Sequence, residues 1–255
     1  MHGYEEFKEK FYRKTKIDLS LYKEKQMKRR IESLITRHKC KDFLEFFKKM
    51  EQEKAVFDEF INFMTINVSE FYRNPEQWEV MKKIVIPKLM QNKKRLNVWS
   101  AACSTGEEPY TLVMVLSEFM PLKDIKILAA DIDLEAMAKA KAGVYSEKSL
   151  ANLPKHFISK YFTKIGNSYQ ISDDVKKCVQ FKQMNLLNDI YPKGMDLICC
   201  RNVMIYFTDE AKEEMYKKFN GALVEGGVFF VGSTEQIISP EKYNFKTLKT
   251  FFYEK

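Results

Sequence analysis

Apolar residues recur at helical spacing through the first quarter of the chain. Residues 5–14, 22–38, 41–49 and 55–67 each place them along one side of a helix, with no glycine or proline inside. The pattern predicts an all-helical N-terminal domain over residues 1–68.

The second of these helices has two unlike faces. One face is an apolar stripe of Met27, Ile31, Leu34 and Ile35. The other face is basic and includes Lys25, Lys28 and Arg29. Residues 22–41 hold eight basic residues against two acidic ones. Such a face is either a solvated surface or a docking surface for an acidic partner.

From about residue 95 the pattern changes to short apolar segments that alternate with longer helices. Residues 95–100, 126–131, 195–200 and 227–232 are strand-like, whereas residues 107–119, 134–141 and 209–223 are helix-like. This alternation predicts an α/β domain over residues 95–255, with a mostly parallel sheet covered by helices. Ligands of such sheets bind beyond the carboxyl ends of the strands.

Two segments fall outside this alternation. Residues 75–90 predict a helix that ends near Pro87, within a linker of residues 69–94. Between residues 145 and 183, the turn Ile165-Gly166-Asn167-Ser168 separates two candidate strands. We therefore expect a small antiparallel β-subdomain inserted at about residues 145–183.

Composition narrows the class of protein. Hydrophobic residues make up 45% of the chain and charged residues 31%, which is typical of a soluble protein with a substantial core. No apolar run approaches the roughly 18 residues that span a bilayer, and the N-terminus has no signal-peptide pattern. We predict a cytoplasmic protein. The net charge of +8 favours an acidic partner.

The cysteines and histidines predict no metal site. None of the cysteines forms a C-x-x-C pair, and the three histidines are scattered. We expect buried thiols at Cys40, Cys103, Cys178, Cys199 and Cys200.

The first predicted strand leads into a loop with the sequence SAACSTGEEPY, residues 100–110. Its small residues allow the backbone to approach a ligand closely. A phosphate-binding loop would contain more glycines and a lysine. Glu107 and Glu108 instead favour a cationic ligand such as S-adenosylmethionine, although acids also suit the first turn of a helix.

Polar residues follow two further strands. Asp131 ends the second strand, 25 residues after Gly106, which is close to the spacing at which an acid reaches ribose hydroxyls in dinucleotide folds. Asp133 is expected to cap the next helix. Arg201 and Asn202 follow the strand at 195–200, at the edge of the sheet where a ligand should lie.

Taken together, these segments resemble the CheR family of chemotaxis receptor methyltransferases. The resemblance rests on TINVSEFYR at residues 65–73, WSAACSTGEEPY at 99–110, DID at 131–133, NLL at 185–187 and CRNVMIYF at 200–207. It extends over nearly the whole chain. The first, second and last of these motifs are long and specific.

The resemblance implies a helical N-terminal domain and a class I S-adenosylmethionine-dependent methyltransferase domain of Rossmann-like fold, with an inserted β-subdomain. It places the cofactor contacts at Asn67, Ser69, Arg73, Glu108, Asp131, Asn185, Leu186, Arg201 and Asn202. The family commonly has threonine where this chain has Ser69, and the hydroxyl is kept. The resemblance also selects Glu108 over Glu107. For methyl transfer, we expect Arg73 to orient the cofactor or the acceptor. Tyr206 either hydrogen-bonds the acceptor or is an aromatic packing residue at the start of a helix.

The implied activity is methylation of receptor glutamates, with S-adenosylhomocysteine as the product. The basic face at Lys25, Lys28 and Arg29 would then dock onto the acidic helical bundle of a membrane-bound receptor. The hairpin turn at residues 166–168 is short, which favours an enzyme that does not depend on a receptor pentapeptide. We expect a monomer that is recruited to receptors without inserting into the membrane.

Two rival functions share the fold. A nucleic-acid methyltransferase would also explain the positive charge, but Arg201-Asn202-Val203 stands where an N-P-P-Y-type motif would be expected. A non-catalytic cofactor-binding regulator is disfavoured by the presence of Arg73, Asp131 and Tyr206.

Overall fold

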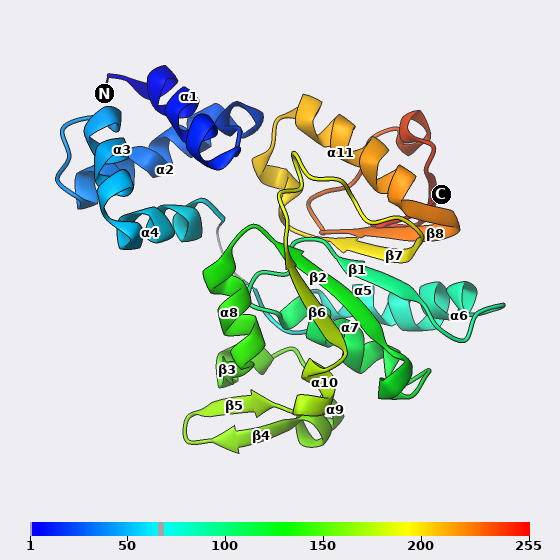
Figure 1. The fold of residues 1–255 in the computed structure, drawn as a ribbon. Helices are drawn as coiled ribbons and strands as arrows, with labels where there is room; N and C mark the ends of the chain where they lie inside the picture. The colour runs from blue at the N-terminus through cyan, green and yellow to red at the C-terminus, as the bar shows by residue number, and fades with distance from the viewer. Residues whose placement is uncertain (1, 66–68) are drawn as a thin grey trace.

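The computed structural model describes residues 2–65 and 69–255. Its first part is helical, as the periodicity predicted, and is drawn in blue and cyan in Figure 1. The elements are α1 (Tyr4–Thr15), η1 (Leu19–Leu21), α2 (Glu24–Arg37), α3 (Phe43–Gln52) and α4 (Lys54–Thr65).

Aromatic side chains hold these helices together. Phe60 of α4 makes edge contacts with Phe11 of α1 and Phe46 of α3, with ring centroids 5.0 and 6.2 Å apart. The predicted apolar stripe of α2 faces this core, since Met27, Ile31, Leu34 and Ile35 are all buried. The basic face of α2 is therefore directed outward.

The second part is built on a seven-stranded sheet with the order β6-β2-β1-β7-β8-β10-β9. Its strands are β1 (Asn97–Ser100), β2 (Lys126–Asp131), β6 (Val179–Gln183), β7 (Met195–Cys200), β8 (Leu223–Val231), β9 (Lys246–Lys249) and β10 (Phe252–Glu254). All neighbours from β6 to β8 pair in parallel, and β10 is antiparallel to both of its neighbours. The predicted α/β class is confirmed, and the strand order reverses between β1 and β7.

Helices cover both faces of this sheet, because successive side chains of each strand point to opposite sides. The covering helices are α5 (Pro75–Val80), α6 (Ile86–Leu89), α7 (Glu107–Leu116), α8 (Leu134–Ala142) and α11 (Asp209–Ala222). On one face Val98 and Leu197 pack with α7. On the other face Trp99 lies 5.6 Å from the Phe219 ring of α11.

The segment expected to be a linker is part of the sheet domain. The helix through α5 and α6 buries Trp78, whose ring contacts Phe230 of β8 edge-on at 5.8 Å. The helix ends at Leu89, one residue short of the predicted range of residues 75–90 and two residues past Pro87, near which we had expected its end. A wider π-helical turn, η2 (Met81–Val85), lies between α5 and α6 and ends two residues before this proline.

The predicted β-subdomain is a separate three-stranded sheet with the order β3-β5-β4, below α8 in Figure 1. It contains β3 (Val144–Ser146), η4 (Glu147–Leu150), α9 (Lys155–Tyr161), β4 (Phe162–Ile165) and β5 (Ser168–Ile171). After α10 (Asp173–Lys176), β6 pairs with β2 in the main sheet. The inserted sheet therefore ends well before residue 183, where we had placed its boundary.

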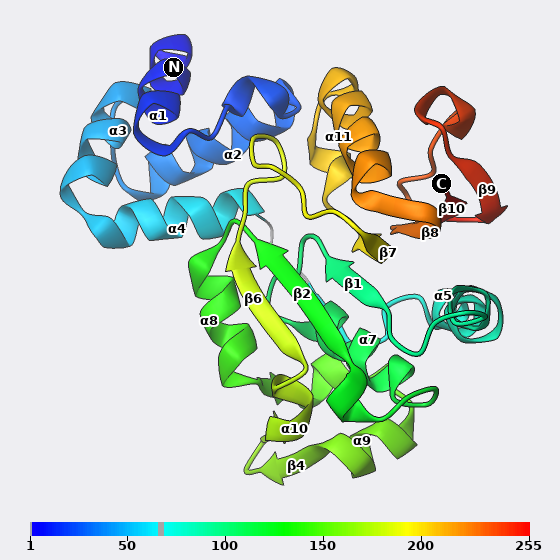
Figure 2. The same ribbon diagram turned by 45° about the vertical axis from the view of Figure 1, so that its right-hand side comes forward.

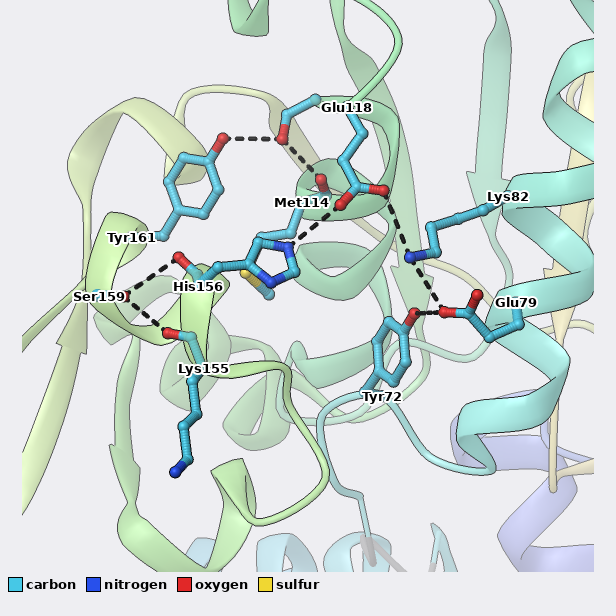
Figure 3. Close-up of polar contacts among 10 residues, drawn as sticks. Tyr72, Glu79, Lys82, Met114, Glu118, Lys155, His156, Ser159 and Tyr161 are labelled. Carbon is cyan, nitrogen blue, oxygen red and sulfur yellow. Dashed lines mark hydrogen bonds and ion pairs between the residues drawn. The ribbon is translucent and has the colours of Figure 1, made fainter.

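Polar contacts attach this subdomain to the main domain (Figure 3). His156 of α9 lies 3.2 Å from Glu118, which follows α7, and Lys82 lies 3.5 Å from the same carboxylate. Lys82 also pairs with Glu79, which accepts a hydrogen bond from the Tyr72 hydroxyl over 3.1 Å. The contacts thus extend from α9 to the residue that precedes Arg73.

The helical domain lies at the edge of the main sheet where β2 and β6 end (Figure 2). The Thr65 hydroxyl donates to Asp133 after β2 over 3.0 Å. Among the described residues, no helix combines the length and apolar character needed to cross a membrane.

Candidate active site

A cavity lies at the carboxyl ends of β1, β2, β6 and β7, next to the helical domain. Its wall includes most of the residues that the sequence singled out, namely Ser69, Arg73, Glu108, Asp131, Asn185, Leu186, Arg201, Asn202 and Tyr206. Asn67 lies outside the described residues. The fold thus gathers segments that are far apart in the sequence at the point where the strand order reverses.

The loop after β1 turns into α7 at Gly106, whose φ of 97° is in the left-handed region. A Cβ atom there would come within 2.8 Å of the Ala140 Cβ and 2.9 Å of the Tyr145 hydroxyl, so glycine is required. Helix α7 begins with Glu107 and Glu108. Because successive helical residues point about 100° apart, the two acids have different surroundings.

Only one of these acids is part of the cavity wall as the structure describes it. Glu108 lines the cavity and accepts a hydrogen bond from the Ser100 hydroxyl over 2.7 Å. Glu107 is buried beside the loop and accepts from the Thr105 hydroxyl over 2.6 Å and from Ser69. Glu107 therefore supports the loop, and Glu108 faces the ligand space.

Asp131 closes the neighbouring part of the wall. Its carboxylate accepts from the backbone N–H of Ser104 over 2.7 Å and from that of Asp133 over 3.0 Å. These two bonds fix the carboxylate between two loops. Asp133 caps α8, as predicted, by accepting from the N–H groups of Glu135 and Ala136.

Burial dominates the electrostatics of both acids. It raises the pKa of Glu108, against the opposing charge of Arg201. Burial also raises the pKa of Asp131, and the hydrogen bonds from Asp133 and Ser104 oppose that effect. A cationic ligand would relieve this cost, because an opposite charge stabilises the ionised carboxylate.

Arg201 is the buried cation of the site, with 7% of its surface exposed. Its Nη2 donates to the Arg73 carbonyl, the Asn74 side chain and the Gln77 side chain at 2.9–3.0 Å. Its guanidinium lies 4.6 Å from the Phe230 ring centroid. Its Nε is buried and has no hydrogen-bond partner within the described part of the chain. Arg201 is thus held rigidly and gives the cavity wall a fixed positive charge.

Asn185 and Leu186 form a tight turn after β6. The Asn185 side chain accepts from the N–H of Leu187 over 3.0 Å, and its own N–H donates to Asp189 over 2.9 Å. The Tyr191 hydroxyl donates to the Leu186 carbonyl over 2.8 Å. These bonds fix the turn against the cavity.

Tyr206 ends the short helix η5 (Met204–Tyr206) and lines the cavity. Burial raises the pKa of Tyr206, and the charges of Arg30 and Arg73 oppose this increase. The hydroxyl is thus close to one arginine from each domain.

Several wall residues were not predicted from the sequence. The helical domain contributes Tyr22 and Met64, and the sheet domain adds Glu70 and Ile132. The Tyr22 ring packs edge-on against Phe207, with centroids 4.9 Å apart. A tyrosine before a basic helix carries no motif, so only the three-dimensional structure reveals its place.

The three basic residues expected to dock a partner lie on α2. Lys25 and Arg29 are exposed, and Lys28 is half-buried with its ammonium 5.4 Å from the centre of the Tyr4 ring. Arg29 also lines a second cavity, which shares Tyr22 and Tyr206 with the first.

The donor set of the first cavity fits S-adenosylmethionine. The acids Glu108 and Asp131 suit its positive charges and its ribose diol, and the positive charge of Arg201 suits its carboxylate. One cavity therefore offers groups for the positive charges, the ribose diol and the carboxylate of that molecule.

The comparisons with known proteins agree with this description. Residues 2–65 match the family described as CheR methyltransferase, all-alpha domain, and residues 67–252 match CheR methyltransferase, SAM binding domain. A protein of Listeria innocua named "Chemotaxis protein methyltransferase" is 45% identical over 240 residues, which cover 94% of this chain and 92% of the relative. A Listeria monocytogenes protein of the same name is 44% identical with the same coverage.

A more distant relative is "Chemotaxis protein methyltransferase 2" of Vibrio cholerae, which is 36% identical over 91% of this chain and 84% of its own length. The family matches cover nearly all of the chain, and their order is that of the two domains in the structure. The chain therefore belongs to the CheR family of S-adenosylmethionine-dependent methyltransferases.

Proposed function

We propose that this protein methylates glutamate side chains of membrane-bound chemotaxis receptors, giving methyl esters for sensory adaptation. The observation that carries the proposal is the adjacency of two cavities. The cofactor cavity shares Tyr22, Met64 and Tyr206 with a second cavity whose wall includes Arg29 and Arg30 of α2. An acidic acceptor helix on α2 would thus lie beside the cofactor. The names of the relatives support a chemotaxis substrate.

The acceptor needs no general base. A glutamate side chain has an ordinary pKa of about 4.3 and is already ionised at neutral pH. Bound S-adenosylmethionine supplies a methyl group activated by a sulfonium. The task of the protein is then to align the carboxylate and to exclude water, because separated charges are better stabilised by water than the dispersed charge of the transition state.

The wall residues have distinct roles in this proposal. Glu108, Asp131 and Arg201 bind the cofactor, together with Ser69, Asn185, Leu186 and Asn202, and with Asn67 beyond the described residues. Arg73 orients cofactor or acceptor and is not an electrophilic catalyst, because a cation paired tightly with the attacking oxygen would stabilise the ground state. Tyr206 holds the acceptor through its hydroxyl.

The basic face of α2 recruits the enzyme from the cytoplasm. Lys25, Lys28 and Arg29 would meet the acidic helical bundle of the receptor as a monomeric enzyme docks. The two-residue turn between β4 and β5, where Ile165 pairs with Ser168, supports an enzyme that does not depend on a receptor pentapeptide.

Transfer of a labelled methyl group to receptor-containing membranes tests the proposal. We expect base-labile label on the receptor, as a glutamate methyl ester requires, and the same rate on receptors truncated at the C-terminus. Label on nucleic acid, or tight cofactor binding with no label on any acceptor, would contradict the proposed substrate.

A further inference from the structure

A further buried acid, Glu235, lies beside the active site and is not used by the proposed chemistry. It follows β8, and only 6% of its surface is exposed. One carboxylate oxygen accepts from the N–H of Asn202 over 2.5 Å and from that of Gly232 over 2.8 Å. The other accepts from the N–H groups of Met204 and Ile205, over 2.7 and 3.3 Å. A single side chain therefore receives four backbone donors.

Three of these donors belong to residues 202–205, the segment between Arg201 and Tyr206. This segment bends sharply, since Asn202 has a φ of 61°, in the left-handed region that favours glycine. The bend turns successive N–H groups inward. Buried donors of this kind need acceptors, and a carboxylate offers two oxygens with several lone pairs.

The loop after β8, on the other side of the Glu235 carboxylate, also allows the two loops to approach closely. A Cβ atom at Gly232 would lie 2.8 Å from the Asn202 nitrogen, so a side chain there would push the two loops apart. Glycine at this position allows the loop after β8 to approach the loop after β7 closely. Both loops thus converge on Glu235.

We propose that Glu235 is a positioning residue for methyl transfer, whose two oxygens fix residues 202–205 so that Asn202 and Tyr206 face the cavity together. The inference rests on the roles proposed for those two residues. In this proposal, the conformation of residues 202–205 is fixed by Glu235, a side chain that contacts neither the cofactor nor the acceptor. Burial raises the pKa of Glu235, but the four N–H donors oppose that increase and favour the ionised form that accepts all four bonds.

The Glu235→Gln variant tests this role with almost no change of volume. Glutamine keeps one acceptor oxygen, but its amide NH2 would face two backbone N–H donors. We expect the turnover number to fall at least tenfold, the receptor KM to change less than threefold, and S-adenosylhomocysteine affinity to fall because Asn202 moves.

Asp196→Asn provides the matched control for lost stability. Asp196 is also buried, accepts from the N–H of Asn97 over 2.7 Å and pairs with Lys93, at the opposite edge of the sheet. We expect this variant to unfold at a lower temperature and to keep the wild-type turnover number in the folded enzyme. If the loss of turnover, divided by the loss of stability, is the same for Glu235→Gln and Asp196→Asn, the proposed role of Glu235 is overturned.

A double-mutant cycle with Tyr206→Phe gives a readout that a purely structural role would not move. If Glu235 acts through Tyr206, replacing Glu235 should lower turnover much less in the Tyr206→Phe background than in the wild type. Additive losses, or wild-type turnover in Glu235→Gln, would overturn the inference. If the wild-type enzyme does not methylate receptors, the proposed function is refuted instead. Calorimetric binding of S-adenosylhomocysteine to the Glu235→Gln variant would then still test the role of Glu235.

Discussion

The backbone N–H of Lys23 donates to the carbonyl of Tyr206 over 2.9 Å, so the start of α2 is joined to the active-site segment of the other domain. The N–H of Thr208 returns a bond to the Leu21 carbonyl over 2.9 Å. This antiparallel bridge brings Tyr22 into the cavity wall. The helical domain, which carries the basic face of α2, thereby also forms part of the cavity wall.

Removing charge from the basic face of α2 should weaken receptor binding. We expect Lys25, Lys28 and Arg29 all changed to Ala to raise the receptor KM about tenfold, because exposed pairs contribute about 0.5 kcal/mol each. The affinity for S-adenosylhomocysteine should not change. Steady-state assays at two salt concentrations measure both the loss and its screening.

The matched control removes three exposed lysines elsewhere. Lys242, in η6 (Pro240–Tyr243), and Lys246 and Lys249, in β9, lie near the far edge of the main sheet. Their replacement by Ala should leave KM unchanged. Equal KM values for the two triple variants at low salt would eliminate the docking surface.

Replacing Arg73 by Ala should impair cofactor binding and turnover together. A hydrogen bond to a charged group contributes about 1.5–3 kcal/mol, so we expect S-adenosylhomocysteine affinity to fall about ten- to a hundredfold. Arg95→Ala is the control, since Arg95 is exposed and pairs with Asp124 at the amino end of the sheet. Normal affinity combined with normal turnover in Arg73→Ala would show that its assigned role is wrong.

The raised pKa of Glu108 predicts a pH effect on cofactor binding. A proton on Glu108 removes the negative charge that attracts the ligand ammonium, so affinity should fall as pH decreases from neutral toward that raised pKa. Calorimetric titration at several pH values measures this slope. Glu108→Gln should bind weakly at every pH and lose most of the slope, and a variant with the wild-type slope would contradict the assignment.

The same shift predicts the opposite trend for folding. A pKa raised in the folded state means that the folded protein takes up a proton more readily than the unfolded chain. The ligand-free protein should therefore gain stability from Glu108 and Asp131 as pH falls from neutral toward their raised pKa values, and lose it as pH rises. Thermal unfolding of the wild type and of Glu108→Gln isolates this contribution.

Asp131→Asn should weaken cofactor binding without unfolding the protein. An asparagine keeps one acceptor for Ser104 or Asp133 but loses the second, and it binds a ribose diol less well. We expect affinity to fall at least tenfold. Asp133→Asn is the control, because asparagine caps a helix about as well as aspartate. Equal affinities for the two variants would remove Asp131 from the ribose site.

Local periodicity predicted the elements of the fold well, because it reports which side of a segment is buried. The ranges of β2 and β7 match the predicted strands at 126–131 and 195–200. Pairing between distant segments leaves no such local trace. The strand β6 was thus assigned to the insertion, although it pairs with β2, and the helix at Pro75 was read as a linker although Trp78 packs on the sheet.

The site was predictable where a motif carried it. Asp131 ends a strand, and Glu108 and Arg201 come after strands, so the α/β pattern alone places all three at the carboxyl ends of the strands. The pattern alone could not tell which of Glu107 and Glu108 faces the cavity, because that depends on how the first turn of α7 is oriented in three dimensions. Tyr22 and Glu235 belong to no motif. Tyr22 reaches the cavity by packing on the distant Phe207, and Glu235 accepts hydrogen bonds from the distant backbone of residues 202–205.

The bridge between Leu21–Lys23 and Tyr206–Thr208 also limits how the two domains can be separated or exchanged. Neither domain contains the complete cavity wall. The helical domain supplies Tyr22 and Met64, and the sheet domain supplies the acids and Arg201. A chimaera that receives its helical domain from a relative must therefore reproduce this backbone bridge as well as the basic face of α2. We therefore expect an exchange of either domain to change substrate choice and methyl transfer together, because both domains contribute to one cavity wall.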